Sequence, residues 1–246
     1  MELQDIRSKL RKLGDKQKAT ILQGFFKTGQ GGYGKGDIFI GVRVPEIRKL
    51  AEKYQDISTT DVQKLLKSPL HEERLLALII LVIKYSKGND VVKKRIYKLY
   101  LKNTRHINNW DLVDLTAEKI VGDYLTDKSK EPLYKLAKSN SLWERRISIM
   151  ATFHFIKQNN FVQTLIVAEM LLKDKEDLIH KAVGWMLREI GKRHLSTEAK
   201  FLNEHSQEMP RTMLRYAIER FPESKRQGYL KGIYADRSED LQLTST

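Results

Sequence analysis

Four side chains, Trp110, Asp114, Arg146 and Trp185, are of types that could bind a nucleic acid. The flat face of a tryptophan can pack on a sugar or a base. An arginine on an otherwise apolar helix needs a carboxylate or a phosphate to offset its desolvation. Structural roles are the alternative: the tryptophans could pack on neighbouring helices, and Asp114 could pair with Arg146.

Trp185 is the most informative of the four because of its helical neighbours. Lys181 precedes it by four residues, and Arg188 and Lys192 follow it at three and seven, whereas the apolar residues of this segment follow another face. Residues at such spacings share one face of a helix. We therefore expect Trp185 on a basic face, with Lys181 and Arg188 as further DNA contacts.

The four residues lie in helices that recur along the chain. Apolar helices are predicted to begin near His71, Ile107, Leu142, Asp177 and Pro210, spaced by 36, 35, 35 and 33 residues. Counted from these starts, the four side chains fall within an arc of about 140 degrees. Three consecutive helices should then point them into one groove, where Asp111 and Glu118 flank the same stripe and could share an acidic role.

Helix is the expected structure almost throughout, because the chain has five prolines and apolar residues recur at three and four positions. Caps such as Ser58 and Ser141 mark individual helix starts. More polar helices are expected at 90–101, 128–137, 160–172 and 197–205, between the apolar ones. This alternation predicts an all-α superhelix of HEAT-like repeats with a concave basic groove, formed as a single domain over residues 1–246.

One segment, the Gly-rich loop at residues 28–43, interrupts the helical pattern. Five glycines between Gly29 and Gly36 exclude a helix, and Ile38 to Ile40 could form a short extended stretch. The spacing GxxxxGK is present, but Gly36 stands where a phosphate-binding loop needs Ser or Thr. The loop could approach a DNA backbone through Tyr33 and Lys35, or it could be an ordinary connector.

Composition and motif content limit the partners, cofactors and reaction types that the protein could have. The net charge of +14 at pH 7 favours an anionic partner. The chain has no cysteine, its six histidines show no metal-ligand spacing, and it lacks a Gly-x-Ser-x-Gly elbow, so we expect neither a metal nor a cofactor nor acyl-transfer chemistry. Without a signal core or a long apolar run, a cytoplasmic protein that does not enter membranes is expected.

Three segments that contain the four residues resemble the AlkD family of alkylpurine DNA glycosylases. They are NWDLVD at 109–114, LWERR at 142–146 and HKAVGWMLRE at 180–189. The resemblance implies a HEAT-like superhelix that hydrolyses the N-glycosidic bond of N3- or N7-alkylated purines in duplex DNA. It further implies that Asp114 is the catalytic aspartate, that Trp110 and Trp185 surround the sugar of the lesion, and that Arg146 contacts the backbone.

The resemblance also sets expectations for partners and for the parts that differ. Double-stranded DNA containing alkylated bases is the expected partner of a monomeric enzyme. Apart from the resemblance, a flexible C-terminal tail is expected at about residues 235–246. The Gly-rich insertion departs from the family's pattern, and Phe25 matches its active-site tyrosine only loosely. A non-catalytic protein that binds branched or damaged DNA is the main alternative, and a protein-binding HEAT scaffold is the second.

Overall fold

A computed structural model describes residues 2–234, and in this range every regular element is helical. The one β pairing among these residues is an isolated parallel bridge between Ile38 and Leu70. The all-α prediction is therefore confirmed. The tail expected at residues 235–246 lies outside the described residues.

The chain divides into two compact units, residues 1–124 and 125–246. Each unit is a set of packed helices and is described by itself. The single domain expected from the sequence stays a prediction. Within residues 2–234, no helix combines the length and the apolar character needed to cross a bilayer.

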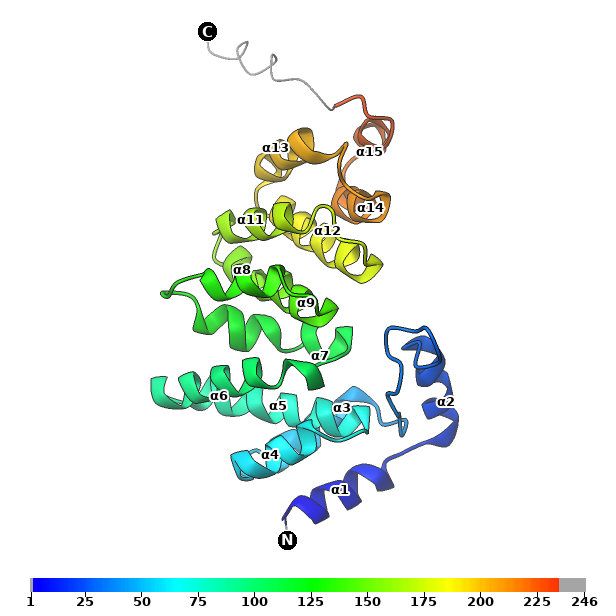
Figure 1. Ribbon diagram of the computed structural model, residues 1–246, viewed down its shortest axis with the longest axis vertical. Coiled ribbons are helices and arrows are strands. Elements are labelled where there is room, and N and C mark those ends of the chain that lie inside the picture. Colours follow the sequence, from blue (N-terminus) through cyan, green and yellow to red (C-terminus); the bar gives the residue numbers. More distant parts are fainter. Residues whose placement is uncertain (1, 235–246) are drawn as a thin grey trace. The chain divides into compact units, whose positions relative to one another are not determined.

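Unit 1 is built around α5 (His71–Lys87), whose residues His71 to Leu81 are all buried. It packs against α3 (Val44–Lys53), α4 (Thr59–Leu66) and α6 (Asp90–Lys102) (Figure 1). The helix α1 (Glu2–Lys12) is attached through Arg7 and Arg11, which both pair with the buried Glu73 of α5. The cap expected at Ser58 forms, because its side chain accepts the N–H of Asp61 at the start of α4.

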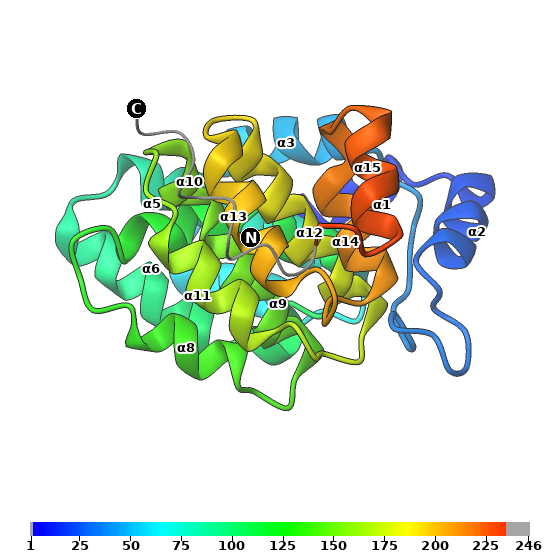
Figure 2. The ribbon, with the colours of Figure 1, turned by 90° about the horizontal axis from the view of Figure 1, so that it is seen from above.

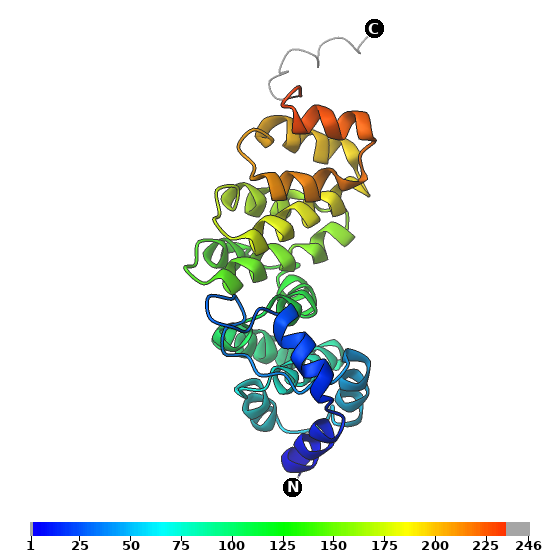
Figure 3. The same ribbon diagram turned by 90° about the vertical axis from the view of Figure 1, so that its right-hand side faces the viewer.

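The helix α2 (Lys16–Phe25) differs from the others because none of its residues is buried. Figures 1 and 2 show α2 and the loop after it on the opposite side of unit 1 from α6, and in Figure 3 α2 lies in front of the rest of the unit. Ile21 and Phe25 leave 68% and 62% of their surface exposed. These two large apolar side chains of α2 are therefore on the surface.

The helix expected from Ile107 onward differs from the prediction. A 3₁₀ turn (Thr104–His106) comes first, the helix α7 covers only Trp110–Asp114, and a π-helical turn follows at Glu118–Gly122. Asn109 caps α7, since its side chain accepts the N–H of Trp110. Trp110 is therefore the first residue of its helix and Asp114 the last.

Unit 2 is centred on α12 (Asp177–Gly191), which packs against α9 (Leu142–Ala151), α11 (Val162–Met170), α13 (Leu195–His205) and α14 (Arg211–Ala217). The remaining helices of the unit are α8 (Glu131–Ala137), α10 (Phe153–Lys157) and α15 (Glu223–Leu230). A Cβ at Gly184 would lie 2.4 Å from the Met213 carbonyl oxygen, so glycine is what allows α14 to pack so closely on α12.

The helix predicted to begin near Leu142 is divided into two helices. Ser141 caps α9 as predicted, but α9 ends at Ala151 and α10 begins at Phe153. The hydroxyl of the buried Thr152 donates to the Ile149 carbonyl oxygen at 2.7 Å. Such a bond from a threonine back to the preceding turn bends or interrupts a helix.

Candidate functional site

Trp110 lies at the centre of an aromatic cluster in unit 1. Its half-buried ring stacks on Phe26, with centroids 5.1 Å apart and planes at 17°, and meets Phe25 edge-on at 5.9 Å. Its indole N–H donates to the Tyr33 hydroxyl at 3.3 Å. These contacts fix the plane of Trp110 from three sides, so its remaining surface is a fixed aromatic face.

The Gly-rich loop folds onto this cluster. Tyr33 donates a hydrogen bond to the Phe25 carbonyl oxygen, and the Lys27 ammonium lies 5.8 Å from the centre of the Tyr33 ring. Gly34 is buried against Phe26, where a Cβ would lie 2.3 Å from the Phe26 carbonyl oxygen. Tyr33 thus contacts Trp110, while its predicted contact with a DNA backbone stays a prediction. Lys35 is exposed, and its ammonium has no ion pair among the described residues.

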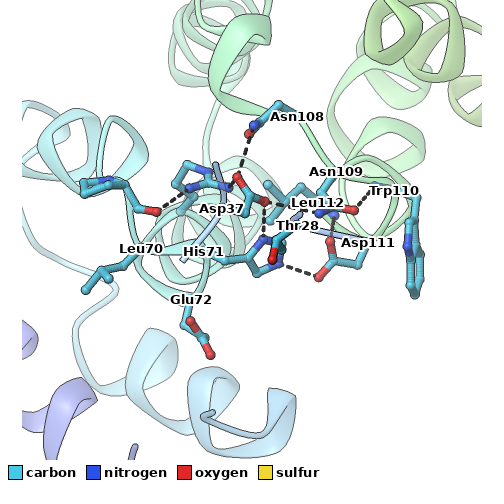
Figure 4. A network of polar contacts seen from close by, with 12 residues as sticks. Thr28, Asp37, Leu70, His71, Glu72, Asn108, Asn109, Trp110, Asp111 and Leu112 are labelled. Carbon is cyan, nitrogen blue, oxygen red and sulfur yellow. Dashed lines mark hydrogen bonds and ion pairs between the residues drawn. The ribbon is translucent and has the colours of Figure 1, made fainter. Parts of the chain in front are cut away.

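A buried polar network lies directly behind Trp110 (Figure 4). The imidazole of His71 contacts two carboxylates, Asp37 through Nδ1 at 3.1 Å and Asp111 through Nε2 at 2.8 Å. Asp37 also accepts hydrogen bonds from Arg74 at 2.7 Å and from Asn109 at 3.2 Å. The network joins the loop, the start of α5 and the start of α7.

The geometry of the network determines its charges. An ionised carboxylate only accepts hydrogen bonds, so both ring nitrogens of His71 must carry protons. Burial opposes the charged imidazole, but the hydrogen bonds to Asp111 and Asp37 outweigh it and raise the pKa of His71. Burial likewise opposes ionisation of Asp37, whereas the His71 hydrogen bond and the Arg74 charge prevail and lower its pKa.

The neighbouring Glu72 holds the end of the Gly-rich loop and points away from this network (Figure 4). Its buried carboxylate accepts the backbone N–H groups of Ile40 at 3.1 Å, Gly41 at 2.8 Å and Val42 at 3.3 Å. Gly41 adopts the left-handed φ of 84°, which favours glycine. The loop is therefore attached to the first turn of α5 through His71, Glu72 and Arg74.

Asp114 follows Trp110 by one helical turn, at the last residue of α7, and is half-buried. Two residues four apart share one face of a helix, so both project from the same side of α7. Its carboxylate is close enough to the buried Tyr100 to act on it: burial and, in smaller part, the Asp114 charge raise the pKa of Tyr100. Asp111, the other acidic candidate, is engaged by His71 and by the N–H of Leu112.

In unit 2, Trp185 is half-buried and its indole N–H donates to Glu189 at 3.2 Å. Lys192 and Arg193 bind the same carboxylate, at 2.5 and 3.2 Å. Burial opposes ionisation of Glu189, but these hydrogen bonds outweigh it and lower its pKa. Glu189 thus orients Trp185, a role the sequence analysis did not assign although the two residues are only four apart.

The face around Trp185 carries less net positive charge than the sequence analysis predicted, because carboxylates lie next to its lysine and arginine side chains. Lys181 pairs with Asp177 at 2.7 Å, and Arg188 pairs with Glu219, which lies in the 3₁₀ turn (Ile218–Arg220) after α14. Each cation is thus beside a carboxylate before any ligand is bound. A phosphate would have to compete with these carboxylates.

Arg146 is buried on α9 and donates through one guanidinium nitrogen to the Leu178 carbonyl oxygen. The adjacent Arg145 pairs with Asp174 at 2.6 Å and also donates to the carbonyl oxygens of Ser139 and Asn140. The predicted groove requires Arg146 and Trp185 to meet Trp110 and Asp114 of unit 1. That meeting stays a prediction.

Glu198 is a buried carboxyl in unit 2 that was not predicted as a site residue. It is 2% exposed, and burial raises its pKa to about 8 despite the opposing charge of Arg188. The folded state therefore holds a proton that the unfolded chain releases above about pH 4.5. We expect Glu198→Gln to reduce the loss of thermal stability of the protein between pH 5 and pH 8. A melting temperature with the same pH dependence in both proteins would contradict this.

The family model described as "DNA alkylation repair enzyme" matches residues 6–221. Among solved structures, the chain is similar to a "Predicted DNA alkylation repair enzyme from Enterococcus faecalis", at 14% identity and a TM-score of 0.64. The match covers 85% of this chain and 97% of that one, and at this identity it shows a shared fold. No curated protein matches the sequence.

Proposed function

The chain belongs to the family of DNA alkylation repair enzymes, and on this premise we propose that it is a DNA glycosylase. Its substrate would be duplex DNA with N3- or N7-alkylated purines, and its product an abasic site. The observation that carries the proposal is the pair on α7: a fixed, half-exposed Trp110 with the half-buried carboxylate Asp114 on the same helical face.

The reaction suits this pair because alkylation at N3 or N7 makes the purine cationic and a good leaving group. When the bond between C1′ and the purine nitrogen breaks, its electron pair leaves with the neutral base and positive charge develops on the sugar. Asp114 stabilises that charge, as carboxylates do in glycoside hydrolysis. A water then adds to C1′ and loses a proton to Asp114 or to solvent.

The remaining predicted residues are proposed to hold the DNA. Trp110 and Trp185 would pack on the sugar of the lesion, where the developing cation gains contact with an aromatic face. Arg146 would bind a backbone phosphate. Lys181 and Arg188 would exchange their carboxylate partners for phosphates, and Tyr33 and Lys35 would place the Gly-rich loop on the backbone.

Base release is the direct test of this proposal. Purified protein is incubated with duplex DNA methylated at N3 and N7 of purines, and free bases are separated by chromatography and quantified. We expect 3-methyladenine or 7-methylguanine to be released and no base to be released from unmethylated duplex. A parallel binding titration uses linear and branched DNA at several salt concentrations.

The two measurements separate the proposal from its alternatives. Tight, salt-dependent binding without base release would support a non-catalytic protein that binds DNA structures. Absence of DNA binding even at low salt would support a protein-binding scaffold instead. Either result would overturn the glycosylase proposal.

A further inference from the structure

Four aromatic rings form a continuous stack from the interior of unit 1 to its surface. His71 stacks on Phe39 with centroids 4.3 Å apart and planes at 22°, Phe39 on Phe26 at 4.8 Å and 19°, and Phe26 on Trp110 at 5.1 Å and 17°. The inner three residues are buried and Trp110 is half-buried. Because consecutive rings are in contact, a rotation of the innermost ring would displace the next one, and the displacement would reach the outermost ring.

The inner end of the stack is held by charge. His71 is bridged by Asp37 of the Gly-rich loop and by Asp111 of α7, which is the residue next to Trp110. Each ring nitrogen binds one of the two carboxylates, so the imidazole cannot turn without breaking one of these bonds. The same imidazole thus fixes the Trp110 backbone through Asp111 and the Trp110 ring through the stack.

The groups that face His71 come from the Gly-rich loop, from α5 and from the start of α7. Asp37 and Asp111 face its nitrogens, Arg74 lies beyond Asp37, and the amides of Asn108 and Asn109 also bind Asp37. Glu72 is turned to the backbone of residues 40–42 and Glu73 to Arg7 and Arg11 of α1. The ordinary pKa of histidine lies closest to neutrality among these side chains.

We infer that His71 is a positioning residue for the proposed glycosylase site: bridged by Asp37 and Asp111, it sets the orientation of Trp110 through Phe39 and Phe26. The inference rests on the proposed function for its effect on base release. The coupling between His71 and Trp110 is a property of unit 1 and can be measured without DNA.

Loss of a proton from His71 should change the orientation of the Trp110 ring. The neutral ring has one N–H donor, so one of its two carboxylates would then face a lone pair. One of the hydrogen bonds from His71 to Asp37 and Asp111 then breaks, and the His71 ring at the inner end of the stack is free to rotate. Because the hydrogen bonds raise the pKa of His71, this release occurs as the pH rises above the ordinary range for histidine.

The test follows the fluorescence of Trp110 alone. In a protein carrying Trp143→Phe and Trp185→Phe, emission and acrylamide quenching are recorded from about pH 5 to pH 9, with circular dichroism to confirm that the fold persists. We expect a single titration with its midpoint above the ordinary pKa of histidine. His71→Gln should abolish it, and Asp111→Asn should keep it but move the midpoint to lower pH, because Asp111 contributes most to raising this pKa.

Phe26→Leu tests the stack itself, since leucine keeps apolar volume but removes the ring between Phe39 and Trp110. His71 should still titrate, as its imidazole proton resonances will report, while the Trp110 signal responds only weakly. If the Trp110 fluorescence of the protein carrying only Trp143→Phe and Trp185→Phe does not change with pH, the inference is overturned. A titration that His71→Gln or Phe26→Leu leaves unchanged also overturns it.

Base release adds a measurement that depends on the proposed function. We expect His71→Gln and Phe26→Leu to lower the single-turnover rate by about 10- to 100-fold, since small misplacements of a substrate-positioning group cost this much. If the parent protein releases no base, the proposed function fails, and the fluorescence titration still decides whether His71 positions Trp110. If base is released but both variants keep the full rate, the positioning role fails alone.

Discussion

Asp114→Asn is expected to lower the rate of alkylpurine release by at least about 100-fold, the usual effect of removing one electrostatic group that stabilises a transition state. The amide has the shape of the carboxylate but no negative charge to offset the cation that develops on the sugar. Single-turnover base release from methylated duplex DNA measures the rate, and a binding titration on the same DNA should show little change in affinity.

A matched control separates this effect from a general loss of negative charge. Asp56 is an exposed carboxylate in the same unit, and Asp56→Asn should release base at the parent rate. Equal rates for Asp114→Asn and the parent protein would contradict the assignment of Asp114. A fall in the melting temperature that accompanies the loss of activity would indicate a structural role instead.

The choice between the acidic candidates of α7 needed the structure. Asp111 and Asp114 are both close to Trp110 in the sequence, and the residue types alone left an acidic role open to either. The structure assigns Asp111 to the His71 bridge. That bridge joins residues 40 apart, and the Asn109 contact to Asp37 joins residues 72 apart, so no local pattern could have revealed them.

The features of the fold that were predicted correctly depend on local chemistry. Ser58 and Ser141 accept N–H groups of the first helical turn, which is a property of a few consecutive residues. The start of α7 was placed three residues too early because the cap is Asn109. Its early end was also missed, and there the hydroxyl of Thr116 bonds to the Leu112 carbonyl oxygen, a contact that interrupts helices. Apolar periodicity continues through such an interruption and does not indicate it.

The ion pairs near Trp185 include some that local spacing predicts and one that it does not. The pairs of Lys181 with Asp177 and of Lys192 with Glu189 are four and three residues apart, so their spacing was available in the sequence. The partner of Arg188 is Glu219, 31 residues away, and could not be inferred in this way. The net charge predicted an anionic partner, whereas only the structure shows which cations already have carboxylates beside them.

Glu72→Ala is expected to lower the free energy of unfolding by about 3–5 kcal/mol, because it leaves three backbone N–H groups without their acceptor. Glu72 accepts the N–H groups of Ile40, Gly41 and Val42, and both Glu72 and its Gly41 and Val42 partners are buried. Urea unfolding followed by circular dichroism measures the loss. Glu72→Gln keeps one carbonyl acceptor and should lose less.

Glu52→Ala on α3 is the matched control, because Glu52 is an exposed glutamate of the same unit and should change the free energy by no more than about 0.5 kcal/mol. If the free energy of unfolding of Glu72→Ala equals that of this control, Glu72 does not stabilise the attachment of the loop to α5. If the loss is found, the same variant should also weaken the contact between Tyr33 and Trp110, because the segment that Glu72 holds ends the loop on which Tyr33 lies. A change in Trp110 fluorescence in Glu72→Ala, absent in Glu52→Ala, would show that the attachment of the loop to α5 also orders the aromatic face proposed to receive DNA.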